Sequence, residues 1–81
     1  MNMNEIKIDV SLDLRGVPCP MNSAKTIVQL EIMDTHEILE VLLDDGEPIE
    51  NVPGSIEEEF YKIIKKKKID NKCWKILIEV L

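Results

Sequence analysis

The chain has 81 residues, of which 16 are acidic and 10 are basic, and its formal net charge at pH 7 is -6. This length suits one small domain spanning residues 1–81, and a hydrophobic content of 44% excludes a disordered chain. The acidic balance argues against direct binding to nucleic acid, which requires a basic footprint, and favours basic patches on protein partners.

The cysteine content and the lack of long apolar runs indicate the compartment. Cys19 and Cys73 lie far apart, whereas small secreted domains carry a denser framework of disulfides. Residues 1–6 are polar and acidic, unlike a secretory signal, and no segment is apolar for long enough to span a membrane. We therefore expect a cytoplasmic protein with reduced thiols and no membrane partner.

Residues 6–14 alternate strictly between apolar and polar side chains. The apolar residues occupy the even positions, Ile6, Ile8, Val10, Leu12 and Leu14. A period of two predicts a half-buried strand. The pattern ends in the stretch 15–18, where Gly16 permits a tight turn and Pro18 holds the preceding residue extended.

From Pro20 to about Met33 the spacing of apolar residues becomes helical. Pro20 suits the first helical position, which makes Cys19 the expected N-cap. A thiol there faces free backbone N–H groups and the positive end of the helix dipole, and both favour the thiolate. The alternative, a buried structural cysteine, fits this loop position less well. The face expected to pack on the sheet consists of Met21, Ala24, Ile27 and Val28.

The middle of the chain predicts a second strand and a second helix. Residues 37–44 are rich in Ile, Leu and Val and predict a central strand, parallel to the first through a right-handed crossover. The second helix is expected to begin near Glu47 and to be kinked or split at Pro53. Ser55 can cap a restart, with the acidic residues 57–59 near the new N-terminus.

The final run, residues 73–81, alternates again and predicts a last strand, with residues 61–69 paired to it as a hairpin. The order βαβαββ indicates the α+β class, a two-layer α/β sandwich with two helices on one face of a four-stranded mixed sheet. The other face is then open. We expect ordinary surface hydrophobics there rather than an interface, namely Leu77, Leu81 and, as further candidates, Ile38 and Leu42.

Several charged or reactive residues have more than one interpretation. Arg15 can stabilise a Cys19 thiolate or persulfide, or it can be a surface arginine that forms an ion pair with a partner or with Asp13, and both readings stay open. We interpret Lys25 as a solvated lysine rather than a contact for a partner, and Lys65–Lys68 as protection of a sheet edge rather than a nucleic-acid patch. Because one histidine and two distant cysteines do not form a zinc pattern, no metal or other cofactor is expected.

The stretch Asp13–Asn22, Asp-Leu-Arg-Gly-Val-Pro-Cys-Pro-Met-Asn, resembles the motif Asp-x-Arg-Gly-x-x-Cys-Pro-x-Pro of the TusA/SirA-like family of small sulfur-carrier proteins. It matches at every place except the last. The likeness extends over residues 8–81, supported by Leu39-Glu-Val41, Asp44-Asp45 and Asn51-Val-Pro53. The family's fold, a βαβαββ two-layer sandwich, agrees with the order of elements predicted above.

The resemblance implies a sulfur relay of the sulfurtransferase type. Cys19 would receive sulfur as a persulfide from a donor, such as a cysteine desulfurase, and a downstream acceptor protein would take it. The residues that the resemblance places around Cys19 in supporting positions are Asp13, Arg15, Gly16, Pro20, Asn22 and Lys25. The alternative is a non-catalytic protein-binding or regulatory module of the same fold.

Three departures from the family pattern stand out. Asn22 replaces the second proline of the motif, which loses rigidity at the helix start but restores a backbone N–H. His36 stands where a turn glycine is usual, and histidine is among the residues that tolerate a left-handed conformation. Asn51 replaces an aspartate and so removes one acidic contact for a partner.

Overall fold

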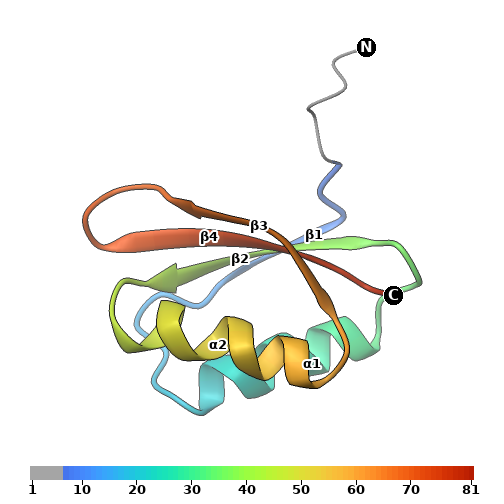
Figure 1. Cartoon of the computed structure of the whole chain (residues 1–81), viewed down its shortest axis with the longest axis horizontal. Coiled ribbons are helices and arrows are strands. Elements are labelled where there is room, and N and C mark those ends of the chain that lie inside the picture. Colours follow the sequence, from blue (N-terminus) through green and yellow to red (C-terminus); the bar gives the residue numbers. More distant parts are fainter. Residues whose placement is uncertain (1–6) are drawn as a thin grey trace.

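The computed structural model describes residues 7–81, and its elements confirm the predicted βαβαββ sandwich. The sheet order is β1-β2-β4-β3, with β1 parallel to β2 and the other pairs antiparallel. Both helices lie on one face of the sheet (Figure 1). Within residues 7–81, no helix is long and apolar enough to cross a membrane. The elements are β1 (Val10–Asp13), α1 (Met21–Glu31), β2 (Ile38–Asp44), α2 (Glu47–Glu58), β3 (Lys62–Lys68) and β4 (Cys73–Glu79).

Strand β1 is shorter than the alternation predicted. It covers Val10–Asp13, whereas Ile8 precedes it and Ile6 lies outside the described residues. Leu14 follows the strand but continues its pattern, because its side chain is buried and its N–H donates to the Leu42 carbonyl oxygen at 3.0 Å. The predicted inward-facing parity is therefore correct, while the ladder itself is short.

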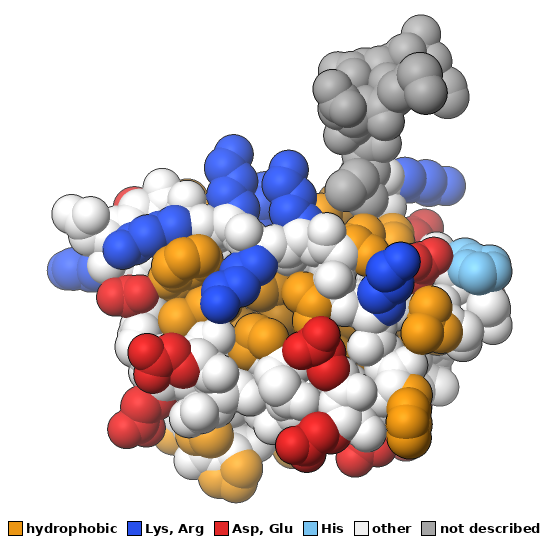
Figure 2. Space-filling model, viewed as in Figure 1, with side chains coloured by type: hydrophobic (Ala, Val, Ile, Leu, Met, Phe, Trp, Pro, Cys, Tyr) orange, Lys and Arg blue, Asp and Glu red, His pale blue; other side chains and the backbone are white. Residues whose placement is uncertain are grey.

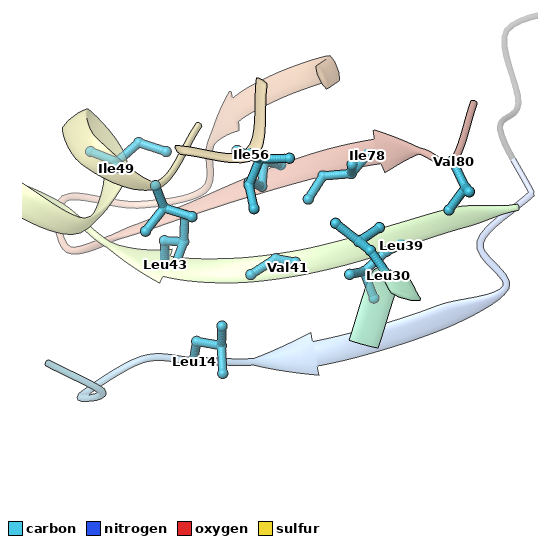
Figure 3. Close-up of a cluster of buried hydrophobic side chains, with 11 residues drawn as sticks. Leu14, Leu30, Leu39, Val41, Leu43, Ile49, Ile56, Ile78 and Val80 are labelled. Atoms are coloured by element: carbon cyan, nitrogen blue, oxygen red, sulfur yellow. The ribbon is translucent and has the colours of Figure 1, made fainter. Parts of the chain in front are cut away.

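The hydrophobic core lies between the helices and the sheet, and its buried side chains are aliphatic (Figure 3). Strand β2 runs through the middle of the sheet, and three of its alternate residues face the helices with no exposed surface. The same core receives buried side chains from α1, α2 and β4 and from the residues that directly follow β1 and β4, while β1 and β3 contribute partly buried side chains that pack against it. Its buried members are Leu14, Leu30, Leu39, Val41, Leu43, Ile49, Val52, Ile56, Ile76, Ile78 and Val80.

Helix α1 buries a different face from the one that the apolar spacing predicted. Its buried residues are Asn22, Ser23, Thr26 and Leu30. Met21 and Val28, expected inside, are 53% and 61% exposed, whereas Ile27, from the same predicted face, is partly buried and packs against the core. The rotation of α1 about its axis therefore places small polar side chains, rather than the apolar stripe, toward the sheet. Apolar periodicity along an 11-residue helix does not contain that information.

Helix α2 is continuous, although the sequence predicted a kink or a break at Pro53. Pro53 lies inside Glu47–Glu58, so the expected restart at Ser55 is wrong. The Ser55 hydroxyl instead donates a hydrogen bond to the Asn51 carbonyl oxygen, at 3.3 Å. The acidic residues 57–59, expected at the start of a restarted helix, lie at the end of α2.

Burial of one face holds α2 together across Pro53. Ile49, Val52 and Ile56 follow one another at helical spacing and are all buried. Burying a side chain of this size contributes about 1.5–3 kcal/mol relative to exposure, whereas a proline inside a helix costs about 3 kcal/mol. Three such residues therefore outweigh one proline, a balance that local sequence signals do not reveal.

The sheet face opposite the helices is less exposed than expected. Leu77 and Ile38, taken as surface hydrophobics, are only 5% and 9% exposed, whereas Leu81 is 64% exposed. Glu40 lies opposite Leu77 in the register, and its carboxylate lies 3.7 Å from the Lys75 ammonium group. Long charged side chains lay their apolar stems over neighbouring residues, so this pair covers apolar surface on the face without a helix.

The predicted hairpin of the last two strands is present, and the turn before β2 is anchored to it. β3 forms one edge of the sheet, and its pairing with β4 shifts register between Ile63 and Lys65. His36 has a φ of 72°, in the left-handed region where a glycine is usual. Its N–H donates to the Val80 carbonyl oxygen at 2.6 Å. Histidine therefore adopts the conformation that this turn requires.

Replacing Leu30 with alanine should lower the free energy of unfolding by about 2–5 kcal/mol, because this core side chain is 1% exposed. Val28→Ala, on the exposed face of the same helix, should change it by less than about 0.5 kcal/mol. Urea unfolding followed by circular dichroism measures both values. Equal losses in the two variants would contradict the observed rotation of α1.

Candidate functional site

The candidate site is a surface cavity of about 450 Å³ between two loops. One loop follows β1 and carries Cys19, and the other follows β2. Because β1 and β2 are parallel neighbours, their C-terminal ends meet at the same edge of the sheet, so the two loops lie side by side. The cavity is lined by Gly16, Val17, Pro18 and Cys19 from the first loop, and by Asp44, Asp45, Glu47 and Pro48 from the end of β2, the second loop and the start of α2.

Two hydrogen bonds fix these loops. Gly16 adopts a φ of 79°, a left-handed conformation, and its N–H donates to the Asp44 carboxylate at 2.6 Å. This bond joins the loop after β1 to the end of β2. The Trp74 indole N–H donates to the Asp45 carboxylate at 2.7 Å, which ties the second loop to β4. These two bonds therefore connect the wall of the cavity to β2 and to β4.

The start of α1 lies one residue later than predicted. The N-cap is Pro20, not Cys19, because the Pro20 carbonyl oxygen accepts the hydrogen bond from the Ala24 N–H at 3.1 Å. Cys19 is exposed and precedes the cap. Two N–H groups of the first turn already have partners: Asn22 N–H donates to Pro18 O, and Ser23 N–H donates to the Asn22 side chain. Fewer free N–H groups are therefore available to the Cys19 thiol than the sequence predicted.

Asn22 acts inside the structure rather than in the cavity. Its side chain has no exposed surface, and its Nδ2 atom has no hydrogen-bond partner among residues 7–81. Its backbone N–H donates to the Pro18 carbonyl oxygen at 3.1 Å, closing the turn that contains Cys19. A proline, which the family motif carries here, lacks this donor. The asparagine that departs from the motif therefore supplies a hydrogen bond that closes the loop around Cys19.

Arg15 forms an ion pair with Asp13, as one interpretation of this residue predicted. The guanidinium donates to both carboxylate oxygens of Asp13, from Nε at 2.9 Å and from Nη2 at 2.6 Å. Hydrogen bonds from Arg15 hold the pKa of Asp13 at about 2, below its usual 3.8, and Asp13 raises the pKa of Arg15. Neither side chain lines the cavity with Cys19.

Lys25 also lies away from Cys19. It lines a separate groove of about 550 Å³ between α1 and β1, with Asp13 among its neighbours there. Of the residues that the family resemblance assigned to the site, the structure brings Cys19 and Gly16 to the cavity wall. Pro20 caps the helix beside them, while Asp13, Arg15, Asn22 and Lys25 do not line it.

The wall facing Cys19 is acidic, and the sequence named Asp44 and Asp45 only in support of the family resemblance, not as site residues. Asp44, Asp45 and Glu47 contribute three carboxylates, and the described residues that line the cavity include no lysine or arginine. The prediction of a parallel strand pair contained the signal needed to find them, because it implies that the loops after the two strands are neighbours.

The second cysteine has a different environment. Cys73 is 4% exposed at the start of β4. Burial raises the pKa of its thiol, and the charge of Arg15 partly opposes this shift. A buried thiol with a raised pKa is a poor nucleophile. The structure therefore favours a structural role for Cys73 over a reactive one.

Comparison with known proteins identifies the family. The family model described as "Sulfurtransferase TusA" matches residues 10–80, nearly the whole chain. The chain belongs to the TusA family. This membership agrees with the TusA/SirA-like motif around Cys19. The match to the family model also covers the strands and helices that position the loop.

Other relatives support membership of the TusA family. A "Putative sulfur carrier protein" of Archaeoglobus fulgidus is 36% identical over 75 residues, which are 93% of this chain and 85% of that protein. A protein of Thermotoga maritima with the same description is 30% identical over 78 residues, 96% and 99% of the two chains. The crystal structure of a SirA-like protein from Desulfitobacterium hafniense has a TM-score of 0.74 at 21% identity, covering 86% and 95% of the chains, and shows the same fold.

Gly16→Ala should destabilise this TusA-family chain by about 1–2 kcal/mol, the cost of a left-handed conformation for a residue with a Cβ. An added Cβ meets no atom within 4 Å, so the backbone alone causes the loss. Gly54→Ala, in α2 with equally open space and no positive φ, is the matched control. It should stabilise the protein by about 0.4–1 kcal/mol in the same urea titration. Similar losses in both variants would contradict this assignment.

Arg15→Gln should raise the pKa of Asp13 from about 2 toward its ordinary 3.8, as measured by NMR titration of the side-chain carboxyl carbon. A carboxyl group with a lowered pKa in the folded state stabilises the protein above its unfolded pKa, and this contribution is lost as the pH falls toward the folded pKa. The wild type should therefore lose more stability than the variant between pH 3.8 and about 2. An unchanged midpoint for Asp13 in the variant would show that Arg15 does not cause the shift.

Proposed function

We propose that this TusA-family protein is a sulfur carrier that holds sulfane sulfur as a persulfide on Cys19. It accepts this sulfur from a donor, such as a cysteine desulfurase, and delivers it to a downstream acceptor protein. The observation that carries the proposal is the position of Cys19. It is an exposed thiol on the wall of a surface cavity, within the loop that bears the family motif.

The contrast between the two cysteines supports the choice of Cys19. A sulfur carrier must bring its thiol within bonding distance of a sulfur held by another protein. Cys19 is exposed in a loop, whereas Cys73 is buried under neighbouring side chains. The proposal includes a reducing compartment such as the cytoplasm, because Cys19 must be a thiol when it meets the donor.

The transfer is an exchange between a thiolate and a persulfide. The Cys19 thiolate attacks the outer sulfur of the donor persulfide and forms a new sulfur–sulfur bond. The bond between the donor's two sulfurs breaks, and its electron pair leaves on the donor cysteine as a thiolate. The proton stays on the transferred sulfur, so the step needs no oxidant or reductant. In delivery, an acceptor thiolate attacks the same outer sulfur and the Cys19 thiolate leaves.

The acidic wall of the cavity indicates the kind of donor surface that fits. Asp44, Asp45 and Glu47 surround the approach to Cys19, and Arg15 is occupied by Asp13 outside the cavity. A partner that presents lysine or arginine beside this wall is attracted to its carboxylates, which steers docking. The same positive charge favours the thiolate form of a nearby cysteine. We infer that a basic donor surface both binds the cavity and activates Cys19.

The test is the intact-protein mass after incubation with a cysteine desulfurase and cysteine. The wild type should gain the mass of one sulfur atom, and a reductant should remove it. Cys19→Ser should show no gain, while the matched variant Cys73→Ser should load like the wild type. The reductant is essential because the two oxygens of a sulfinic acid weigh almost as much as one sulfur and survive reduction.

Inorganic polysulfide, which needs no docking surface, separates a wrong donor from a wrong function. Loading by polysulfide but not by the desulfurase would replace the donor and retain the carrier. Loading of Cys19→Ser would contradict the assignment of the thiol. No loading of the wild type from either source would favour a non-catalytic binding module with this fold.

A further inference from the structure

The exposed edge strand β3 concentrates positive charge in a chain that is acidic overall. Its sequence, Lys-Ile-Ile-Lys-Lys-Lys-Lys, places five lysines in seven residues, and all five are exposed. Seven of the ten basic residues of the chain lie between Lys62 and Lys75, a stretch with one acidic residue, Asp70. Blue side chains accordingly gather on the hairpin side of the molecule and red ones over the helices (Figure 2).

The backbone of β3 is arranged to accept another strand. β3 ends the sheet order, so one of its sides faces away from β4. In an antiparallel pair, alternate residues direct their N–H and C=O groups to the partner strand. Ile69 N–H donates to Cys73 O at 2.9 Å, and this alternation assigns Lys67 to the inner side. The backbone groups of Lys66 and Lys68 therefore point outward, where an added strand would bond.

The lysine side chains flank this edge on both faces of the sheet. Lys65 and Lys67 lie opposite Leu77 and Lys75 in the register, and the intervening lysines belong to the other face. On that other face, the ammonium groups of Lys66 and Lys68 lie 5.4 and 5.7 Å from the centre of the Trp74 ring. Cation–π contacts of this kind hold lysine side chains in defined positions. An added strand would thus meet positive charge on both faces of the sheet, and on one face Trp74 holds the lysine side chains in place.

We propose that β3 is a docking edge for an extended acidic segment of a partner protein, which joins the sheet as a fifth strand. Strand addition of this kind takes its affinity from backbone hydrogen bonds and its specificity from side chains along the edge. The five lysines repel the same edge of a second copy, which protects the protein from self-association. A segment rich in Asp and Glu turns that repulsion into attraction.

A protein segment fits this edge better than a nucleic acid does. Outward N–H and C=O groups alternate along β3, and only another peptide backbone matches both donors and acceptors at strand spacing. The net charge of -6 and the acidic residues of α2 also repel a long polyphosphate chain. A short acidic peptide reaches β3 without crossing that surface.

The experiment measures binding of a labelled peptide by fluorescence anisotropy. The probe is a peptide of about seven residues, the length of an ordinary strand, that alternates Glu with Val. Lys66→Glu/Lys68→Glu should weaken its binding by about tenfold or more, since it places like charges across the new pairing. The matched control Lys7→Glu/Lys25→Glu has the same net charge but leaves β3 unchanged, and it should bind like the wild type. The single tryptophan, Trp74, lies beneath two of the lysines and provides a second signal through its emission.

Two further probes test the mode of binding and the class of partner. The same peptide with alternate amides N-methylated keeps its charge but loses strand pairing, and it should not bind. Oligouridine of similar length should bind more weakly than the acidic peptide. Four results would each overturn the proposal. They are equal binding of the N-methylated peptide, tighter binding of oligouridine, equal losses in the two double variants, and no binding of the acidic peptide at all.

Discussion

The parallel pairing of β1 with β2 is the constraint on which the site depends. β2 lies inside the sheet, and its residues Leu39, Val41 and Leu43 are buried between the sheet and the helices. This apolar strand fixes where β1 ends, and with it the start of the loop that carries Cys19. Because parallel strands end at the same edge, the loop after β2 supplies the opposite wall of the cavity. The exposed Cys19 thiol and the carboxylates thus line one cavity as a consequence of packing elsewhere.

Charge is separated between two surfaces of this small molecule. The wall facing Cys19 carries carboxylates, and the edge at β3 carries lysines. Trp74 contacts both, since its indole N–H binds Asp45 while Lys66 and Lys68 lie over its ring. The two proposals together give one chain a basic partner at its thiol and an acidic partner at its edge. Opposite charges on separate faces favour such distinct encounters over indiscriminate association.

The loop before α1 shows how a departure from a family motif can be absorbed. Asn22 replaces a proline, and its N–H closes the turn around Cys19 by bonding the Pro18 carbonyl oxygen. Its side chain is buried, and the same helix face buries Thr26, whose hydroxyl donates to the Asn22 carbonyl oxygen at 2.9 Å. Polar groups thus occupy the interface where apolar residues were expected. They satisfy the backbone locally and allow α1 to pack on the sheet.

The sequence by itself determined the order of the elements, the inward parity of the strands and the loop position of Cys19. These are local properties: alternation has a period of two wherever a strand is half buried, and Gly16 and Pro18 break it. Only the tertiary structure decided the rotation of α1, the continuity of α2 across Pro53 and the meeting of Asp44 with the Cys19 loop. Each depends on the free energy of contacts between segments far apart in the chain, which propensity and spacing do not encode.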